Sequence, residues 1–204
     1  MNKHLIAFYA LIAISLIALT FFVQYYPISF LDTFVTHEVQ EIKMGHFTFL
    51  MTFISVFGNS VVTPLSVLFT SLCFFATYHR RESLFTLATI IPDLLNILTK
   101  ILIHRPRPTL ENAKILLTFT QSGYPSGHVV HYVVFFGFLL TAMLVNNKLH
   151  LFWRILIGVF SAFLIITVSI SRIYLGAHWV TDVVGGYLFG IIYLGIILKF
   201  YLRR

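Results

Sequence analysis

The stretch that decides the fold class is Leu5–Val23, LIAFYALIAISLIALTFFV, in which no residue carries a charge. Its length matches the roughly 20 apolar residues that a helix needs to cross a bilayer. A cleaved signal peptide is the competing interpretation, because Lys3 precedes the apolar run. The run is longer than a signal-peptide core and no small-x-small cleavage site follows it, so the sequence predicts a retained membrane helix.

The composition of the whole chain supports a membrane protein. Of 204 residues, 58% are apolar and 10% are charged, whereas soluble domains carry about 25% charged residues. A water-soluble globule of this size needs more polar surface than these side chains supply. The net charge of +7 is not gathered into the basic, aromatic-interleaved stretches that bind nucleic acids. We therefore expect a bilayer partner and no nucleic-acid partner.

Five further apolar runs are predicted to cross the bilayer, namely Val61–Tyr78, Ser83–Ile103, His128–Val145, Leu151–Ile170 and Trp179–Lys199. Between the first two spans, Ile28–Phe49 mixes charged and apolar residues at a spacing of three to four. That pattern predicts an amphipathic helix lying at the membrane interface. The predicted fold is an all-α integral membrane bundle of six transmembrane helices, with this interfacial helix after the first. One domain covers residues 1–204.

The positive-inside rule gives the predicted orientation. With the N-terminus inside, eight basic residues fall on the inner side: Lys3, Arg80, Arg81, Lys148, Arg154, Lys199, Arg203 and Arg204. Six fall on the outer side: Lys43, Lys100, Arg105, Arg107, Lys114 and Arg172. Both termini are therefore expected to be cytoplasmic, and the long loop after Ile103 is expected to face outward.

Three segments carry polar residues to this outer face. The third span ends in Lys100, followed after six residues by Arg107-Pro108, and the fourth begins with Pro125-Ser126-Gly127-His128. Between the last two spans lies Ser171-Arg172, with His178 and Asp182 after it. Charged side chains near a bilayer are costly and usually mark a functional site. The segments Lys100–Asp182 therefore predict an active or binding site.

In order and spacing, these three segments resemble the signature of the type 2 phosphatidic acid phosphatase (PAP2) superfamily. The resemblance implies a membrane enzyme that removes phosphate from a lipid phosphate or diphosphate through a phosphohistidine, with no metal and no cofactor. Undecaprenyl diphosphate, phosphatidylglycerophosphate and phosphatidate are the candidate substrates. An outward-facing site on a small helical bundle suits a bacterial plasma membrane.

The residue chemistry agrees with that resemblance. His178 and Asp182 are four residues apart, so they share one face if a helix begins near His178. A carboxylate on one ring nitrogen leaves the other nitrogen as a nucleophile. His128 is then available to protonate the leaving alkoxide. We expect these three residues to be catalytic.

The remaining motif residues are suited to hold a phosphoryl group. Lys100, Arg107 and Arg172 supply positive charge for the phosphate and its transition state. Ser126 and Gly127 stand where the fourth helix begins, and free backbone N–H groups at a helix start bind anions. We expect these five residues to bind the substrate phosphate. Ser126 is also expected to occupy the N-cap of that helix.

Two other classes of function use the same residues. A phosphotransferase would pass the phosphoryl group from the histidine to an acceptor lipid or sugar instead of water. A non-catalytic transporter or binder of phospholipid heads would need a polar path across several helices, whereas the first span contains few polar groups and no inverted repeat is present. The sequence does not indicate an oligomeric state.

Several polar residues and glycines lie outside the signature. Arg105 is interpreted as a membrane anchor or a phosphate-steering charge. His131 is expected to pack structurally, and Asp93, inside the third span, has no assigned role. Polar side chains of the interfacial segment are expected to be solvated: His37, Glu38, Glu41 and His46. Glycines of the last span are expected to permit close helix packing: Gly185, Gly186 and Gly190.

Overall fold

The computed structural model describes residues 3–42, 45–118 and 121–203, and within these ranges every regular element is a helix. Among the described residues, five stretches are long and apolar enough to cross a membrane: Lys3–Tyr25, Arg80–Ile103, Gly127–Val145, Leu151–Tyr174 and Val180–Tyr201. This confirms the prediction of an all-helical, multi-pass membrane protein. Lys43 and Arg204, both used in the charge comparison, lie outside the described residues.

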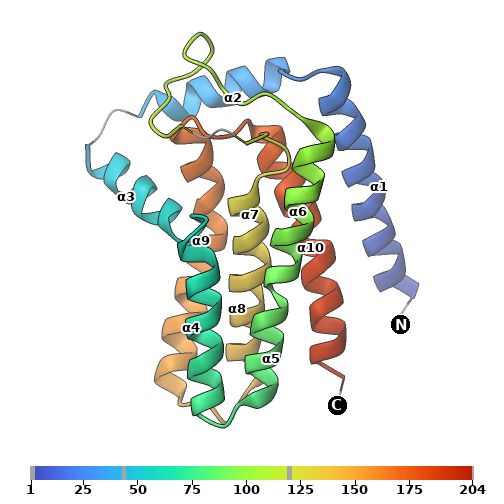
Figure 1. The fold of residues 1–204 in the computed structure, drawn as a ribbon, viewed down its shortest axis with the longest axis vertical. Helices are drawn as coiled ribbons and strands as arrows, with labels where there is room; N and C mark the ends of the chain where they lie inside the picture. Colours follow the sequence, from blue (N-terminus) through green and yellow to red (C-terminus); the bar gives the residue numbers. More distant parts are fainter. Residues whose placement is uncertain (1–2, 43–44, 119–120, 204) are drawn as a thin grey trace.

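The expected second span is shorter in the structure than in the sequence-based prediction. It forms helix α4, Val62–Ala76, which has 15 residues and is about 22 Å long at the usual rise. Helix α3, Gly45–Val56, precedes it, and the Gly58-Asn59-Ser60 break separates the two. In Figure 1 α3 leads down into α4 along one side of the bundle. A break after Val56 therefore divides this apolar stretch into two short helices.

The expected interfacial helix is also shorter, and its polar side faces the protein. Helix α2, Phe30–Gln40, crosses one end of the bundle (Figure 1). Its buried residues are Asp32, Thr36 and Gln40, whereas Phe30 is 83% exposed. The predicted range Ile28–Phe49 is therefore wrong as a single helix. The four polar residues expected to be solvated are exposed: His37, Glu38, Glu41 and His46. The buried polar residues of α2, at three-to-four spacing, instead dock onto the bundle.

The bundle is built around one enclosed helical column. This column consists of α7 (Gly127–His131), a π-helical turn η1 (Tyr132–Phe136) and α8 (Gly137–Val145). Around it stand α1 (Lys3–Tyr25), α5 (Arg80–Ala88), α6 (Ile90–Ile103), α9 (Leu151–Tyr174) and α10 (Val180–Tyr201). Both chain ends lie toward one end of the bundle, and the loop after α6 lies at the other (Figure 1).

Glycines of α10 allow the central column to approach α10 closely, as predicted. A Cβ built on Gly186 or Gly190 would lie 2.8 Å from Val129 or Val133 respectively. On Gly185 it would lie 2.5 Å from the Tyr124 ring. These contacts fix the start of α7 against the start of α10, which brings the second and third motif segments together.

Candidate active site

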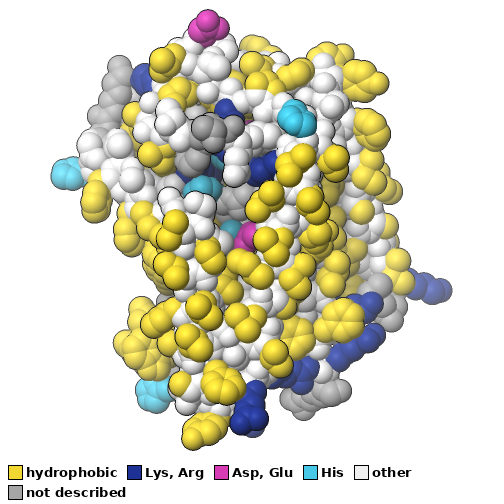
Figure 2. Space-filling model, in the orientation of Figure 1, with side chains coloured by type: hydrophobic (Ala, Val, Ile, Leu, Met, Phe, Trp, Pro, Cys, Tyr) yellow, Lys and Arg dark blue, Asp and Glu magenta, His cyan; other side chains and the backbone are white. Residues whose placement is uncertain are grey.

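All eight predicted site residues lie at the end of the bundle opposite the termini. Lys100 is in the last turn of α6 and Arg107 follows in the loop. Ser126, Gly127 and His128 begin the central column. Arg172 is in the last turn of α9, and His178 and Asp182 flank the start of α10. Figure 2 shows a hollow between α4 and α6 in which basic and histidine side chains are visible beneath the apolar surface.

The pair formed by His178 and Asp182 has the predicted arrangement. His178 Nδ1 lies 3.3 Å from Asp182 Oδ2, and both residues are almost wholly buried. The same carboxylate oxygen accepts the backbone N–H of Trp179 at 3.0 Å. Asp182 stands in the first turn of α10, where the helix dipole stabilises negative charge. With Nδ1–H donated to Asp182, the lone pair of His178 is on Nε2.

Arg107 faces that second nitrogen. Its Nη1 lies 3.3 Å from His178 Nε2 and donates to the carbonyl of Ala177 at 2.6 Å. Lys100 Nζ donates to the carbonyl of Ser122 at 2.7 Å, and Arg107 Nη2 lies 3.4 Å from the same oxygen. Two cations from the first motif thus converge on the loop beside the His178 ring.

The histidine beside this cation cluster has a shifted pKa. Burial lowers the pKa of His178 well below its usual value of 6.5, and the positive charges of Arg107, Lys100 and Arg172 lower it further. Burial also lowers the pKa of Arg107 to about 10, partly offset by Asp182. His178 is therefore neutral, and Arg107 charged, at neutral pH.

Arg172 and His128 meet at a residue that the sequence analysis did not select, Ser55 of α3. Arg172 Nη1 donates to Ser55 Oγ, and His128 Nε2 lies 3.5 Å from the same oxygen. Gly58 faces the Cδ2 side of the same ring, because a Cβ there would lie 2.3 Å from His128 Cδ2, the carbon bonded to Nε2. The break between α3 and α4 thus forms one wall of the site. Neither residue has a local motif that would have revealed it.

The loop before α7 places Ser126 between these groups. Its backbone N–H donates to the carbonyl of Asp182 at 3.0 Å. Ser126 occupies the N-cap position, but its side chain makes no capping bond, and its buried hydroxyl has no partner among the described residues. A Cβ on Gly127 would lie 3.1 Å from Asn96 Nδ2 and 3.7 Å from Lys100 Cε. Glycine thus leaves room for an oxygen beside Lys100.

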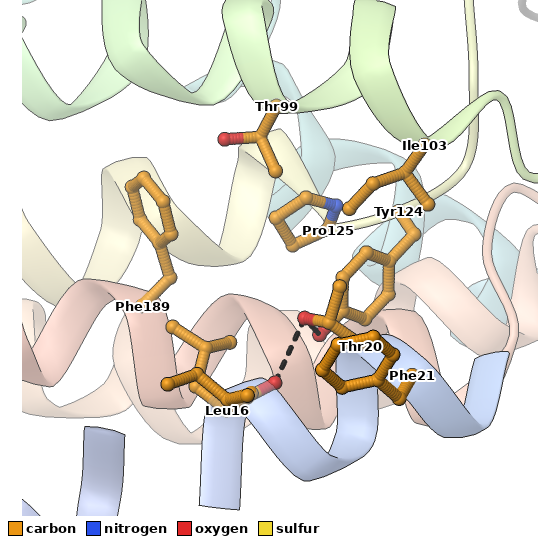
Figure 3. A pocket seen from close by; sticks show the side chains of 9 residues that line it. Leu16, Thr20, Phe21, Thr99, Ile103, Tyr124, Pro125 and Phe189 are labelled. Atoms are coloured by element: carbon orange, nitrogen blue, oxygen red, sulfur yellow. Dashed lines mark hydrogen bonds between the residues drawn. The ribbon is translucent and has the colours of Figure 1, made fainter. Parts of the chain in front are cut away.

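An apolar cavity of about 210 Å³ lies behind this loop, between α1, α6 and α10. Figure 3 shows Tyr124 and Pro125 facing Thr20 and Phe21 of α1 across it. The Tyr124 hydroxyl lies 3.0 Å from Thr20 Oγ1. This contact holds the residues just before Ser126 against the first span.

Comparison with known proteins identifies the family. The PAP2 superfamily model matches residues 81–204. The chain belongs to the PAP2 superfamily. It is 32% identical over 145 residues to an undecaprenyl-diphosphatase of Sulfolobus acidocaldarius, covering 69% of this chain and 64% of that protein. It is also 32% identical over 148 residues to phosphatidylglycerophosphatase B of Bacillus subtilis, covering 70% of each.

Two solved structures have a similar fold. A transmembrane PAP2 type phosphatidylglycerolphosphate phosphatase from Bacillus subtilis superposes with a TM-score of 0.74 at 23% identity, covering 92% of this chain and 94% of that one. LpxE of Aquifex aeolicus superposes with a TM-score of 0.61 at 22% identity, covering 83% and 95%. The fold likeness therefore extends to the N-terminal helices that the family model does not include.

Two polar residues of this PAP2 chain that had no catalytic assignment form a pair inside the bundle. His131 Nδ1 lies 2.9 Å from Asp93 Oδ2, and the His131 ring stacks on Phe135 with centroids 5.1 Å apart. The packing predicted for His131 is thus confirmed, and the structure gives Asp93 a partner. Ser171 of the third motif is likewise a tie between helices, since its hydroxyl donates to the carbonyl of Met51 at 2.6 Å.

Proposed function

We propose that this PAP2 protein is a membrane lipid phosphatase that works through a phosphohistidine on His178. The observation that carries the proposal is the setting of the His178 ring. Its Nδ1 lies against the Asp182 carboxylate, and its Nε2 faces the Arg107 guanidinium. A neutral, oriented imidazole beside a fixed cation is what attack on a phosphoryl group requires.

In the first step, the lone pair of His178 Nε2 attacks phosphorus and the bond from phosphorus to the lipid oxygen breaks. His128 donates its proton to that oxygen, which leaves as the lipid alcohol, or as the lipid monophosphate when the substrate is a diphosphate. Positive charge on the phosphorylated imidazole is balanced by Asp182. The phosphoryl oxygens are bound by the residues already grouped at this end: Lys100, Arg107, Arg172, Ser126 and Gly127.

In the second step, neutral His128 removes a proton from water as the water oxygen attacks the phosphohistidine. The nitrogen–phosphorus bond breaks, inorganic phosphate leaves, and both histidines return to their starting states. No metal enters either step. A phosphotransferase would differ only in replacing this water by an acceptor hydroxyl.

The membrane arrangement that supports this chemistry has six spans, with α3 and α4 together forming the second. α1 brings the chain to the site end, and both termini lie at the opposite end (Figure 1). Basic side chains gather at that terminal end in Figure 2, in keeping with a cytoplasmic position. The site then faces outward from a plasma membrane. The substrates named in the relatives, undecaprenyl diphosphate and phosphatidylglycerophosphate, remain the first candidates, with phosphatidate beside them.

Phosphate release by detergent-purified protein tests the function directly. Undecaprenyl diphosphate, phosphatidylglycerophosphate and phosphatidate are each supplied in mixed micelles with a chelator present, with and without added acceptor alcohols. We expect chelator-resistant release of phosphate without an acceptor. Product formation only when an acceptor is added would replace hydrolysis by phosphotransfer, and no product from any lipid would refute the enzymatic proposal.

The lowered pKa of His178 predicts how activity depends on pH. Protonation removes the nucleophilic lone pair, so a lowered pKa keeps His178 active to lower pH. In Arg107→Gln one neighbouring positive charge is lost, the pKa of His178 rises, and the acid limb of kcat/KM should move up by about one pH unit. Rates measured between pH 4.5 and 8 check this. A limb that moves to lower pH, or does not move, contradicts it.

Gly58 predicts an effect of one methyl group on catalysis. In Gly58→Ala the new Cβ would overlap the His128 ring, and the ring must shift from its present position beside Ser55. We expect kcat to fall by about 10- to 100-fold, since small misplacements of a catalytic group have effects of this size. Gly45→Ala is the matched control, because a Cβ at Gly45 meets nothing within 4 Å. Equal activity in the two variants would contradict the placement of His128.

A further inference from the structure

Arg105 is buried at the back of the catalytic pair and bonds to four groups. Its Nη1 donates to Asp182 Oδ1 at 2.5 Å and to Thr181 Oγ1 at 2.7 Å. Its Nη2 donates to Asp32 Oδ2 at 2.7 Å, and its Nε donates to the carbonyl of Pro27 at 2.9 Å. The side chains of Arg105, Asp32 and Asp182 are all 0% exposed. A residue placed here is neither a membrane anchor nor a steering charge at the surface.

The two carboxylate oxygens of Asp182 therefore bind different groups. Oδ2 faces His178 and the N–H of Trp179, and Oδ1 is held by Arg105. The direction of the carboxylate toward His178 is thus set by the guanidinium on its other oxygen. This is the arrangement in which an outer hydrogen-bond partner orients a group that contacts the reacting residue.

Asp32 is the second carboxylate on the same guanidinium. Its Oδ1 accepts from the N–H and hydroxyl of Thr181 at 3.0 and 2.7 Å. Its Oδ2 also accepts from the hydroxyl and N–H of Ser29 at 2.8 and 3.1 Å, which caps α2. Through Asp32, the helix that crosses the end of the bundle is tied to the first turn of α10. Two buried carboxylates thus share one buried cation.

We propose that Arg105 is a positioning residue that holds Asp182 in its orientation toward His178, with Asp32 as the balancing carboxylate from α2. This inference rests on the proposed function, because it concerns the same histidine. Burial of an uncompensated charge is costly, and Arg105 compensates Asp182. Among the described residues, the other charged or titratable groups around Arg105 and Asp182 are His178, Arg107, Lys100 and Tyr124.

Arg105→Met leaves the two buried carboxylates without their cation. Without the guanidinium the two buried negative charges repel each other uncompensated, which favours protonation of Asp182, so at neutral pH Asp182 loses its charge in much of the protein. We expect kcat to fall about 100-fold, the upper range for loss of an orienting partner. KM should change little, because the phosphate ligands remain. Activity should rise with pH as Asp182 loses this proton, which adds to the pH profile an acid limb that the wild-type protein lacks.

The decisive experiment adds Asp32→Asn to Arg105→Met. The second change removes the like charge that competes with Asp182, so kcat at pH 7 should recover about tenfold and the new acid limb should move back to lower pH. If Arg105 only stabilises the packing of these segments, Asp32→Asn removes a further contact. The double variant must then be no more active than Arg105→Met alone. No recovery, or an unchanged pH profile, would overturn the proposal.

Controls separate this proposal from the function on which it rests. Arg154→Met removes an arginine that also ties backbone segments, through the carbonyls of Met143 and Leu144 at the other end of the bundle, and it should keep the wild-type pH profile. Thermal unfolding in detergent shows that each variant is folded. A wild-type protein without phosphatase activity refutes the proposed function. An active wild type with equally active Arg105→Met refutes only the role of Arg105.

Discussion

His178→Ala is expected to lower the rate of phosphate release by about 10⁴-fold or more, the effect of removing a nucleophile that forms a covalent intermediate. Without the imidazole, the cations can still bind the phosphate, but no group is placed to accept it. KM or inhibition by inorganic phosphate should therefore change far less than kcat. We would measure phosphate release from the preferred lipid at several substrate concentrations, and compare kcat and KM between the wild-type protein and His178→Ala.

A trapping measurement gives this prediction a second readout. Brief reaction with lipid carrying radioactive phosphate should label the wild-type protein, with a label that is stable in alkali and lost in acid, as a phosphorylated imidazole requires. His178→Ala should carry no label. His46→Ala, which removes an exposed histidine of α3, is the matched control and should label normally. Full turnover or normal labelling in His178→Ala would contradict the assignment of His178 as the nucleophile.

His128→Ala should show the second large effect, and its size should depend on the leaving group. A phosphomonoester such as phosphatidate must release an alkoxide, which needs a proton, so the rate should fall by about 10³- to 10⁴-fold, the upper range for loss of a general acid. A lipid diphosphate releases a lipid monophosphate, a leaving group that does not need to be protonated. Its first step should slow by only about tenfold. Rates of the first step on both substrates, followed as release of the lipid alcohol or of the lipid monophosphate with one preparation, test the difference.

The same variant should accumulate the intermediate. Because His128 also activates water in the second step, phosphohistidine formed from a lipid diphosphate should persist in His128→Ala. One equivalent of lipid monophosphate should then appear as a burst, followed by slow turnover. An equal loss of rate on monoester and diphosphate, with no burst, would contradict the role of His128 as acid and base.

The spacing of residues along the sequence was enough to predict much of this site. His178 and Asp182 are four residues apart at a helix start, a spacing that brings two side chains onto one face, and the structure places them in contact. The motif residues lie at one end because the apolar runs between them have the length of a bilayer, which alternates the ends of successive helices. The apolar runs likewise predicted the bounds of five spanning helices to within four residues at each end.

The remaining contacts of the site form between segments that are distant in the sequence, and the sequence did not predict them. Asp32 lies in a stretch that reads as a solvated amphipathic helix, yet it pairs with Arg105, 73 residues away, and Arg105 belongs to no motif. Ser55 and Gly58 enter the site only because α3 ends beside His128. Helical spacing and bilayer thickness can be read from a sequence because they are local. Which buried charge faces which depends on how the helices pack, and so only the tertiary structure determined the setting of Asp182.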